Sequence, residues 1–173
     1  MGQTIESINK ARVLEAFDTL FNKRDYAAAE RYWSPSYVQH SAHISPGRDG
    51  LFDLIKSIPS TLKYESGTIV AEGDFVIVHG RYSGHGLHAN WIVADIVRMK
   101  DGILMEHWDV IQDEATRESS KSGLPMFGEQ FIGQVRVLQT SEGETGEQGG
   151  EQPILNESRT GSCRESRRIP DRE

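Results

Sequence analysis

The first third of the chain has the hydrophobic periodicity of amphipathic helices. Over residues 5–22, apolar side chains recur mostly at steps of three and four residues. This spacing predicts helices, which we place at residues 5–22, 26–33 and 50–58. The second and third helices each end before a proline, which cannot continue a helix. The segment between them, residues 36–50, is predicted to be an irregular connection because it contains a Pro-Gly pair.

From residue 62 onward the period changes to two, which is typical of strands with one buried face. The alternation predicts four consecutive strands, at residues 62–73, 74–84, 90–100 and 103–112. Helices followed by a run of strands indicate an α+β fold. We therefore expect the N-terminal helices to pack on an antiparallel or mixed sheet.

The turn between the last two strands predicts which of their side chains meet. Residues 100–102, Lys-Asp-Gly, fit a three-residue turn with a bulge at the glycine. Counted outward from that turn, Asp95 faces His107 directly, and Asp109 lies diagonal to Asp95. The opposite face of the two strands is largely apolar and carries Ile92, Ile96, Leu104, Trp108 and Val110.

An aspartate and a histidine that meet among apolar neighbours have the chemistry of an acid–base pair. Burial penalises the charged forms while each partner favours the charge of the other, so both pKa values shift. A structural ion pair is the alternative interpretation. Because such a pair can often be replaced by apolar residues without loss of stability, its presence favours a functional role. Asp95 and His107 are therefore the first candidates for catalysis.

Four further polar residues are candidates for the same cavity. His79 and Arg81 alternate with apolar residues on one face of the second strand, which places them in the cavity or at its rim. His40 and His43 lie in the connection after the second helix, where loops often supply site residues. Exposed loop histidines remain the alternative for this second pair.

The spacing of the histidines does not predict a metal site. His40 and His43, and likewise His85 and His88, are three residues apart, but neither pair lies on a predicted helix. The chain has no HExxH motif, no cysteine pair, no phosphate-binding glycine loop and no GxSxG motif. We expect no metal and no cofactor.

Composition and charge narrow the class of protein. The net charge of −7 argues against non-specific nucleic-acid binding, which needs a basic surface. No apolar run approaches the length of a membrane span, and the N-terminus lacks the apolar centre of a signal peptide. The only cysteine, Cys163, rules out a disulfide within the chain. We expect a soluble, cytoplasmic protein without a membrane partner.

The C-terminal part of the chain differs from the rest in composition. From about residue 139 it is rich in Gly, Glu, Ser, Arg and Gln, and it has no aromatic residue. Such a segment cannot bury enough apolar surface to offset the entropy lost on ordering. We predict one domain over residues 1–128 and an extension over 129–173 that is mostly a disordered tail.

The order of elements and four sequence stretches resemble one protein family. The stretches are "YVQHSAHISPGRDGL", "FVIVHGRYSG", "ADIVRMKDGILMEHWDVIQ" and "KSGLPMF". Together they resemble the SnoaL-like polyketide cyclases of the nuclear-transport-factor-two-like superfamily, over residues 5–128. The family often has a proline shortly after the loop histidine, where this chain has Ser-Ala-His at 41–43.

The resemblance implies a cone-shaped α+β barrel in which helices close a curved sheet over a deep apolar pocket. It implies a cofactor-free cyclase, dehydratase, isomerase or epoxide hydrolase. By position, Asp95 would be the general acid/base, with His107, Asp109 and His40 as its nearest partners. The side chains expected to shape the pocket are Phe17, Trp33, Trp91 and Met105.

The main hypothesis is therefore a cyclase that acts by acid–base chemistry on a carbonyl-containing polyketide or related secondary metabolite. Ring closure of the aldol or lactone type, with or without dehydration, would follow proton abstraction. The alternatives are a non-catalytic binding or dimerisation module, an isomerase, or an epoxide hydrolase that uses Asp109 and Arg81. The apolar outer face of the sheet is too large to leave in water, so we expect a homodimer through that face.

Overall fold

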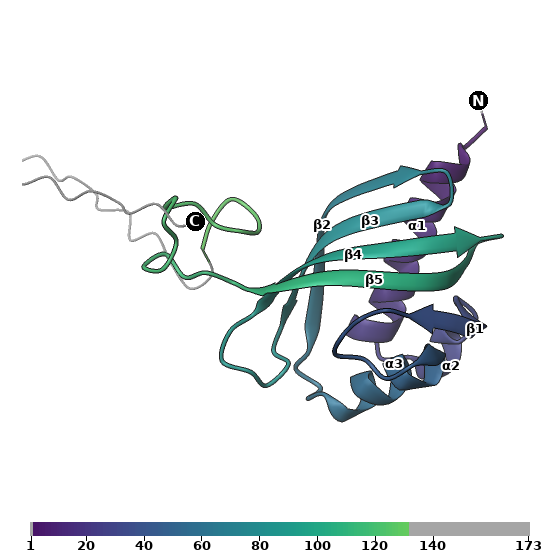
Figure 1. Ribbon diagram of the computed structural model, residues 1–173, viewed down its shortest axis with the longest axis horizontal. Coiled ribbons are helices and arrows are strands. Elements are labelled where there is room, and N and C mark those ends of the chain that lie inside the picture. The colour runs from purple at the N-terminus through teal and green to yellow at the C-terminus, as the bar shows by residue number, and fades with distance from the viewer. Residues whose placement is uncertain (1, 132–173) are drawn as a thin grey trace, which may run out of the picture. The chain divides into compact units, whose positions relative to one another are not determined.

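The computed structural model describes residues 2–131, which form an α+β domain (Figure 1). Its helices are α1 (Ile5–Phe17), a π-helical turn (Asp18–Asn22), α2 (Tyr26–Ala29) and α3 (Gly47–Ser57). Its strands are β1 (Trp33–Gln39), β2 (Lys63–Glu72), β3 (Phe75–Ser83), β4 (Trp91–Lys100) and β5 (Ile103–Asp113). Most of the predicted tail, residues 132–173, lies outside the described residues. The predicted domain boundary at residue 128 stays a prediction.

The five strands form one mixed sheet in the order β1-β5-β4-β3-β2. Strands β2 to β5 are an antiparallel meander, as the alternation predicted, and β1 runs parallel to β5. The helices lie together on one side of this curved sheet (Figure 1). The predicted α+β class with a mixed sheet is thus confirmed. No helix within residues 2–131 is both long and apolar enough to cross a membrane.

Strand β1 was not predicted from the sequence. The expected helix over 26–33 ends at Ala29, and β1 takes up the last residue of that helix and the start of the irregular connection expected at 36–50. β1 contains Pro35 and several serines, so its apolar alternation is weak, and proline is tolerated because β1 is an edge strand. Backbone hydrogen bonds tie its two ends to β5, from Leu104 N–H to the Tyr32 carbonyl and from His40 N–H to the His107 carbonyl.

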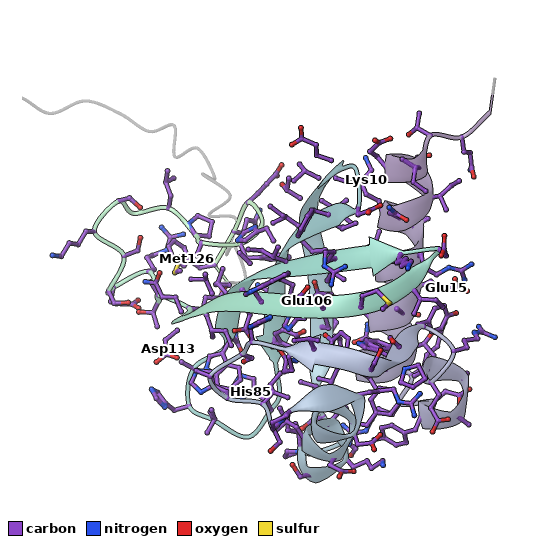
Figure 2. All side chains as sticks on the ribbon, turned by 45° about the vertical axis from the view of Figure 1, so that its right-hand side comes forward. Lys10, Glu15, His85, Glu106, Asp113 and Met126 are labelled. Atoms are coloured by element: carbon purple, nitrogen blue, oxygen red, sulfur yellow. The ribbon has the colours of Figure 1, made fainter. Side chains whose placement is uncertain are left out.

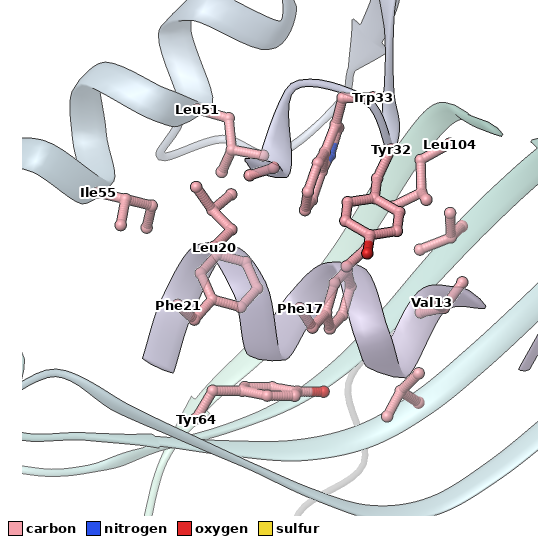
Figure 3. Packing of buried hydrophobic residues seen from close by; sticks show 14 of the residues in the cluster. Val13, Phe17, Leu20, Phe21, Tyr32, Trp33, Leu51, Ile55, Tyr64 and Leu104 are labelled. Atoms are coloured by element: carbon pink, nitrogen blue, oxygen red, sulfur yellow. The ribbon is translucent and has the colours of Figure 1, made fainter. Parts of the chain in front are cut away.

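The core packs around α1, with Leu51 and Ile55 of α3 on one side of it and Tyr64 of β2 on the other (Figure 3). Thr4 caps α1 by accepting a hydrogen bond from the backbone N–H of Ser7. The buried face of α1 continues into the π-helical turn, where Leu20 is fully buried. Phe17 packs edge-on against Tyr64 of β2, with ring centroids 5.3 Å apart. Aromatic side chains of the helical layer and of the sheet therefore meet at the centre of the domain.

The hairpin between β4 and β5 has a shorter turn than predicted. Lys100 pairs with Ile103, so the loop contains only Asp101 and Gly102. Both loop residues have positive φ, 52° and 76°, as a type I′ turn requires. The expected three-residue turn is therefore wrong. The Asp-Gly pair is itself the favoured sequence for a two-residue hairpin loop.

A β-bulge further along the hairpin sets the register of the site. Met99 pairs with Leu104 and Arg98 with Glu106, so Met105 is the extra residue. Beyond the bulge, Asp95 lies opposite Asp109, and His107 lies opposite Val97. The predicted direct pairing of Asp95 with His107 is therefore wrong by two positions.

The bulge also changes the face on which two apolar side chains lie. Leu104 is fully buried in the core, although the predicted register placed it on the outer face. Met105 leaves the core side of the sheet and lines a surface hollow with Pro35 and Ile103. The alternation of faces then resumes correctly at His107, because one unpaired residue absorbs the mismatch.

The segment that follows β5 packs back onto the outer face of the sheet without forming a helix or strand. The Phe127 ring lies 4.8 Å from the Arg81 guanidinium and 5.4 Å from the His79 ring. Gly67 of β2 makes room for it, because a Cβ atom there would approach the ring to 3.0 Å. Figure 2 places Met126 in this segment, beyond the end of β5, where its sulfur accepts a hydrogen bond from Ala115 N–H.

The burial of Leu20 gives a test of this core. Leu20→Ala should lower the free energy of unfolding by about 2–5 kcal/mol, because it removes buried methyl groups and leaves a cavity. Ile8→Ala, on the same helical segment but at a side chain that is 40% exposed, should change it by less than about 1 kcal/mol. Chemical denaturation of both variants measures the difference. Equal losses would contradict the packing described here.

Candidate active site

A cavity of about 280 Å³, partly open to solvent, lies between the helices and the inner face of the sheet. This volume is near the lower end of the range for small-molecule sites. Most of its lining is apolar or aromatic: Phe17, Phe21, Trp33, Tyr37, Ile44, Leu51, Leu54, Ile55, Ile58, Leu62, Tyr82, Leu87, Trp91, Val93 and Ile111. Its other lining residues are Ser41, His43, His85, Asp95, His107 and Asp109. The cavity therefore combines an apolar wall with a small number of polar groups.

Asp95 and His107 are in direct contact in this cavity. The distance from Asp95 Oδ1 to His107 Nε2 is 3.0 Å, and the two residues are 2% and 6% exposed. Their backbone positions are diagonal across the β4–β5 ladder, so the longer imidazole side chain reaches over to the carboxylate. The contact predicted from the sequence is thus present, although the register behind it differs.

The hydrogen bonds of Gln39 define the protonation of His107. Gln39 Oε1 accepts the backbone N–H of Ser41 at 3.0 Å, which identifies this atom as the oxygen of the amide. The same oxygen lies 2.9 Å from His107 Nδ1, so Nδ1 must carry a hydrogen and donate it. His107 Nε2 then shares one proton with Asp95. The pair is either an imidazolium with a carboxylate or an imidazole with a carboxylic acid.

The second carboxylate oxygen of Asp95 is held by Tyr64. The Tyr64 hydroxyl donates to Asp95 Oδ2 at 3.4 Å, and burial followed by the charge of Asp95 raises the Tyr64 pKa. Asn22, at the end of the π-helical turn, fixes Tyr64 through its backbone: its amide accepts from Tyr64 N–H at 2.8 Å and donates to the Tyr64 carbonyl at 3.1 Å. Asp95 and His107, which we call the dyad, are thus held in place from both the helical layer and strand β2.

Burial is the main cause that raises the pKa of Asp95 above its ordinary value. The hydrogen bond to His107 and its charge oppose the shift, and the nearby carboxylate of Asp109 adds to it. Asp109 lies opposite Asp95 on the ladder and also lines the cavity. Two carboxylates and one imidazole therefore share one wall of the site, and Asp95 holds a proton more readily than an aspartate in water.

His40 lies outside the cavity, which corrects its expected place beside Asp95. Its Nε2 atom is 2.8 Å from Glu106 Oε1, and its ring stacks on Trp108 with centroids 4.7 Å apart. Glu106 also binds Arg98, and hydrogen bonds from both partners lower the Glu106 pKa. All four side chains belong to the outer face of the sheet, where Figure 2 shows Glu106 on β5. His40 directly follows Gln39, the last residue of β1. Because the Gln39 side chain points inward to His107, the alternation of faces places His40 on the outer side.

His79 and Arg81 also lie on the outer face and do not enter the cavity. Arg81 binds Glu65 at 2.6 Å and Glu114 at 3.4 Å, and Phe127 covers both residues. Their alternation with apolar residues was read correctly, but that face points away from the helices. An epoxide hydrolase site built on Arg81 therefore lacks its arginine.

The remaining predicted lining residues divide into two groups. Phe17, Trp33, Trp91 and His43 line the cavity, whereas Met105 does not, because the bulge turns it away. Their roles in substrate binding stay predictions.

His85 is a cavity residue that the sequence interpretation missed. It lies in the loop between β3 and β4, and its ring stacks on Trp91 with centroids 4.4 Å apart. The sequence suggested it only as half of a weak metal-ligand pair. Its position between two glycines in a loop next to a strand was the available signal. Within residues 2–131, no three His, Cys, Asp or Glu side chains are grouped so as to hold a metal ion.

The raised pKa of Asp95 predicts how pH affects stability. Because the folded chain holds this proton more tightly than the unfolded chain, stability falls as pH rises from about 4, the ordinary aspartate pKa, through the raised value. Asp95→Asn removes this dependence, since its amide can donate to His107 Nε2. The variant should therefore gain stability relative to the natural protein as pH rises through that window, measured by thermal unfolding. Asp53→Asn, at a side chain that is 75% exposed, is the control and should not show this gain.

The sequence model of the SnoaL-like domain matches residues 13–107, more than half of the chain. No curated protein matches the sequence. One similar solved structure is AclR from Streptomyces galilaeus, a proposed hydroxylase, with 27% identity over 61% of this chain and 79% of that one and a TM-score of 0.50.

Two structures of lower sequence identity share the fold. A proposed ketosteroid isomerase from Kribbella flavida has 16% identity over 75% of this chain and 99% of that one, with a TM-score of 0.59. A proposed SnoaL-like polyketide cyclase from Jannaschia sp. CCS1 has 18% identity over 65% and 90%, with a TM-score of 0.55. With the helix-covered curved sheet and the matched sequence model, these findings show that the chain belongs to the SnoaL-like domain family.

Proposed function

We propose that this protein is a cofactor-independent enzyme that acts by acid–base chemistry on a small, largely apolar, carbonyl-containing molecule of the polyketide type. The observation that carries the proposal is the 3.0 Å contact between Asp95 and His107 inside an apolar cavity. A protein that only binds a ligand needs hydrogen-bond donors, but it has no need of a buried carboxylate that shares a proton with an imidazole.

The proposed reaction starts when the Asp95 carboxylate removes a proton from the carbon next to a substrate carbonyl. The electron pair of that C–H bond forms a C=C bond while the π pair of the carbonyl moves to its oxygen, which gives an enolate. The enolate carbon attacks a second carbonyl of the same molecule, which forms the ring bond, and the resulting alkoxide takes the proton back from Asp95. Loss of water is an optional later step.

His107 has two roles in this scheme. As an imidazolium it keeps Asp95 ionised in a cavity where burial favours the neutral acid. Gln39 holds Nδ1 as a donor, so the proton that His107 shares with Asp95 is the one at Nε2. Asp109, opposite Asp95 on the ladder, is the second carboxylate available to relay a proton or orient a hydroxyl group.

Proton abstraction can be tested without knowledge of the natural substrate. Asp95→Asn should lower the rate of deuterium incorporation at the α-carbon of α-tetralone in D₂O by at least about 100-fold, because a positioned base contributes this much or more. Nuclear magnetic resonance follows the loss of the C–H signal. An unchanged rate in a folded Asp95→Asn variant would exclude Asp95 as the base.

The matched control is His40→Gln. Because His40 lies on the outer face and binds Glu106, this variant should keep the exchange rate of the natural protein. A binding module without catalysis would show no exchange above buffer in any of the three proteins.

We further propose that the outer face of the sheet forms a homodimer interface. Four apolar side chains on this face are 40–68% exposed: Val70, Phe75, Ile77 and Val110. They lie on three different strands of one sheet, and such patches on a soluble domain usually mark an interaction site. Leu104, expected in this patch, is instead part of the core.

The dimer can be tested with a charge in the patch. Val110→Glu should convert the dimer to a monomer in sedimentation velocity, because a carboxylate cannot be buried unpaired in an apolar interface. Ile5→Glu, at a side chain of α1 that is 51% exposed, should leave the assembly unchanged. A natural protein that sediments as a monomer at micromolar concentration would refute this interface.

A further inference from the structure

The loop between β3 and β4 brings a histidine into the cavity at the end remote from the dyad. His85 stands between Gly84 and Gly86, which both have positive φ, 67° and 92°, so the loop turns sharply on each side of it. It is 8% exposed, and it is one of the residues that line the cavity. Figure 2 shows His85 near the end of the sheet where Asp113 lies.

The two ring nitrogens of His85 have different environments. Nδ1 accepts the backbone N–H of Leu87 at 3.4 Å, so in the neutral ring the hydrogen is on Nε2. Burial lowers the pKa of His85, and the charge of Asp113 opposes this only in part, which favours the neutral ring. His85 therefore presents one N–H donor, at a defined nitrogen.

This donor has no acceptor within the described part of the chain. Nε2 is buried and makes no hydrogen bond to residues 2–131. A buried polar group without a partner costs about 1–3 kcal/mol, and folded proteins rarely leave one in that state. The ring cannot easily turn to find a partner, because Trp91 stacks on it at 4.4 Å with an interplanar angle of 27°. The donor is fixed in direction and lacks only an acceptor.

The position of His85 gives the spacing between two polar ends of the cavity. Its stacking partner, Trp91, precedes Asp95 by four residues on β4, and a strand advances about 3.3 Å per residue. The backbones of Trp91 and Asp95 are therefore roughly 13 Å apart along β4. Between them the wall includes apolar Val93 of β4 and Ile111 of β5. A ligand that reaches both ends must be elongated, apolar in its middle, and polar at each end.

We propose that His85 is a specificity-determining residue that donates a hydrogen bond from Nε2 to an acceptor oxygen at the end of the substrate opposite the reacting carbonyl. The substrate class is an elongated, apolar ring compound with a carbonyl at the dyad and a second carbonyl, ester or ether oxygen at the far end. A group that can only donate a hydrogen bond does not satisfy this nitrogen. The inference rests on the proposed function, because it assigns the second end of the same cavity.

Matched ligands test the acceptor directly. The probes are α-tetralones that carry an acetyl group at each free position of the aromatic ring in turn, each paired with the isopropyl analogue of equal heavy-atom count. Calorimetric titration should find at least one pair in which the acetyl compound binds the natural protein about ten-fold more tightly, the effect expected of one buried hydrogen bond. Equal binding within every pair, or no binding at all, would overturn the proposal.

Two substitutions separate the donor from the ring. His85→Phe keeps an aromatic ring for Trp91 to stack on but removes the N–H, so the preference for the acetyl compound should disappear. His85→Gln keeps an N–H donor and should retain most of it. A preference that persists in His85→Phe would overturn the assignment, and thermal unfolding confirms that both variants are folded. In the natural protein, the Nε2–H resonance of His85 should shift when the acetyl compound binds and not when the isopropyl analogue binds.

Measuring both the deuterium exchange rate and the acetyl preference in Asp95→Asn and in the His85 variants distinguishes this proposal from the proposed catalysis. If Asp95 is not the base, the exchange rate survives that substitution while the acetyl preference still depends on His85. If His85 does not select the acceptor, the preference is absent although exchange still requires Asp95. Each result therefore refutes one statement and leaves the other standing.

Discussion

The contact between Asp95 and His107 is the interaction on which the functional site depends. Two ionisable groups are removed from water together, and each is acceptable there only because of the other. The fold adds further constraints: Gln39 fixes the imidazole, and Tyr64 binds the second carboxylate oxygen. The π-helical turn and the edge strand of the sheet thus both help to position the Asp95–His107 pair.

The two faces of the sheet use similar residues for different purposes. On the inner face, a histidine and carboxylates meet in an apolar hollow, where charge is costly and proton transfer can be controlled. On the outer face, His40 pairs with Glu106 where solvent weakens the contact, and Arg81 pairs with Glu65 beneath Phe127. The same residue types therefore form the proposed acid–base group on one side of the sheet and structural ion pairs on the other.

Sequence patterns predicted the class of the fold and the central pair, but not the face of every strand. The alternation that grouped His79 with Arg81 was correct, yet apolar residues occur on both faces of β3, so hydrophobicity alone did not show which one is inside. The bulge at Met105 shifted the pairing of β5 with β4, and no pattern in the local sequence predicts this shift. β1 was missed because a proline-containing edge strand has little apolar alternation. Asp95 and His107 were still found, since direct and diagonal neighbours on one face are both within reach.

The place of Gln39 at the end of β1 has a consequence for the dynamics of the site. An edge strand has a neighbour on one side only, so fewer backbone hydrogen bonds hold the end of β1 than hold a central strand. When the end of β1 separates from β5, the amide that defines the Nδ1 hydrogen leaves with it. A brief opening of a few residues, far smaller than global unfolding, is then enough to let the imidazole rotate and exchange its tautomer.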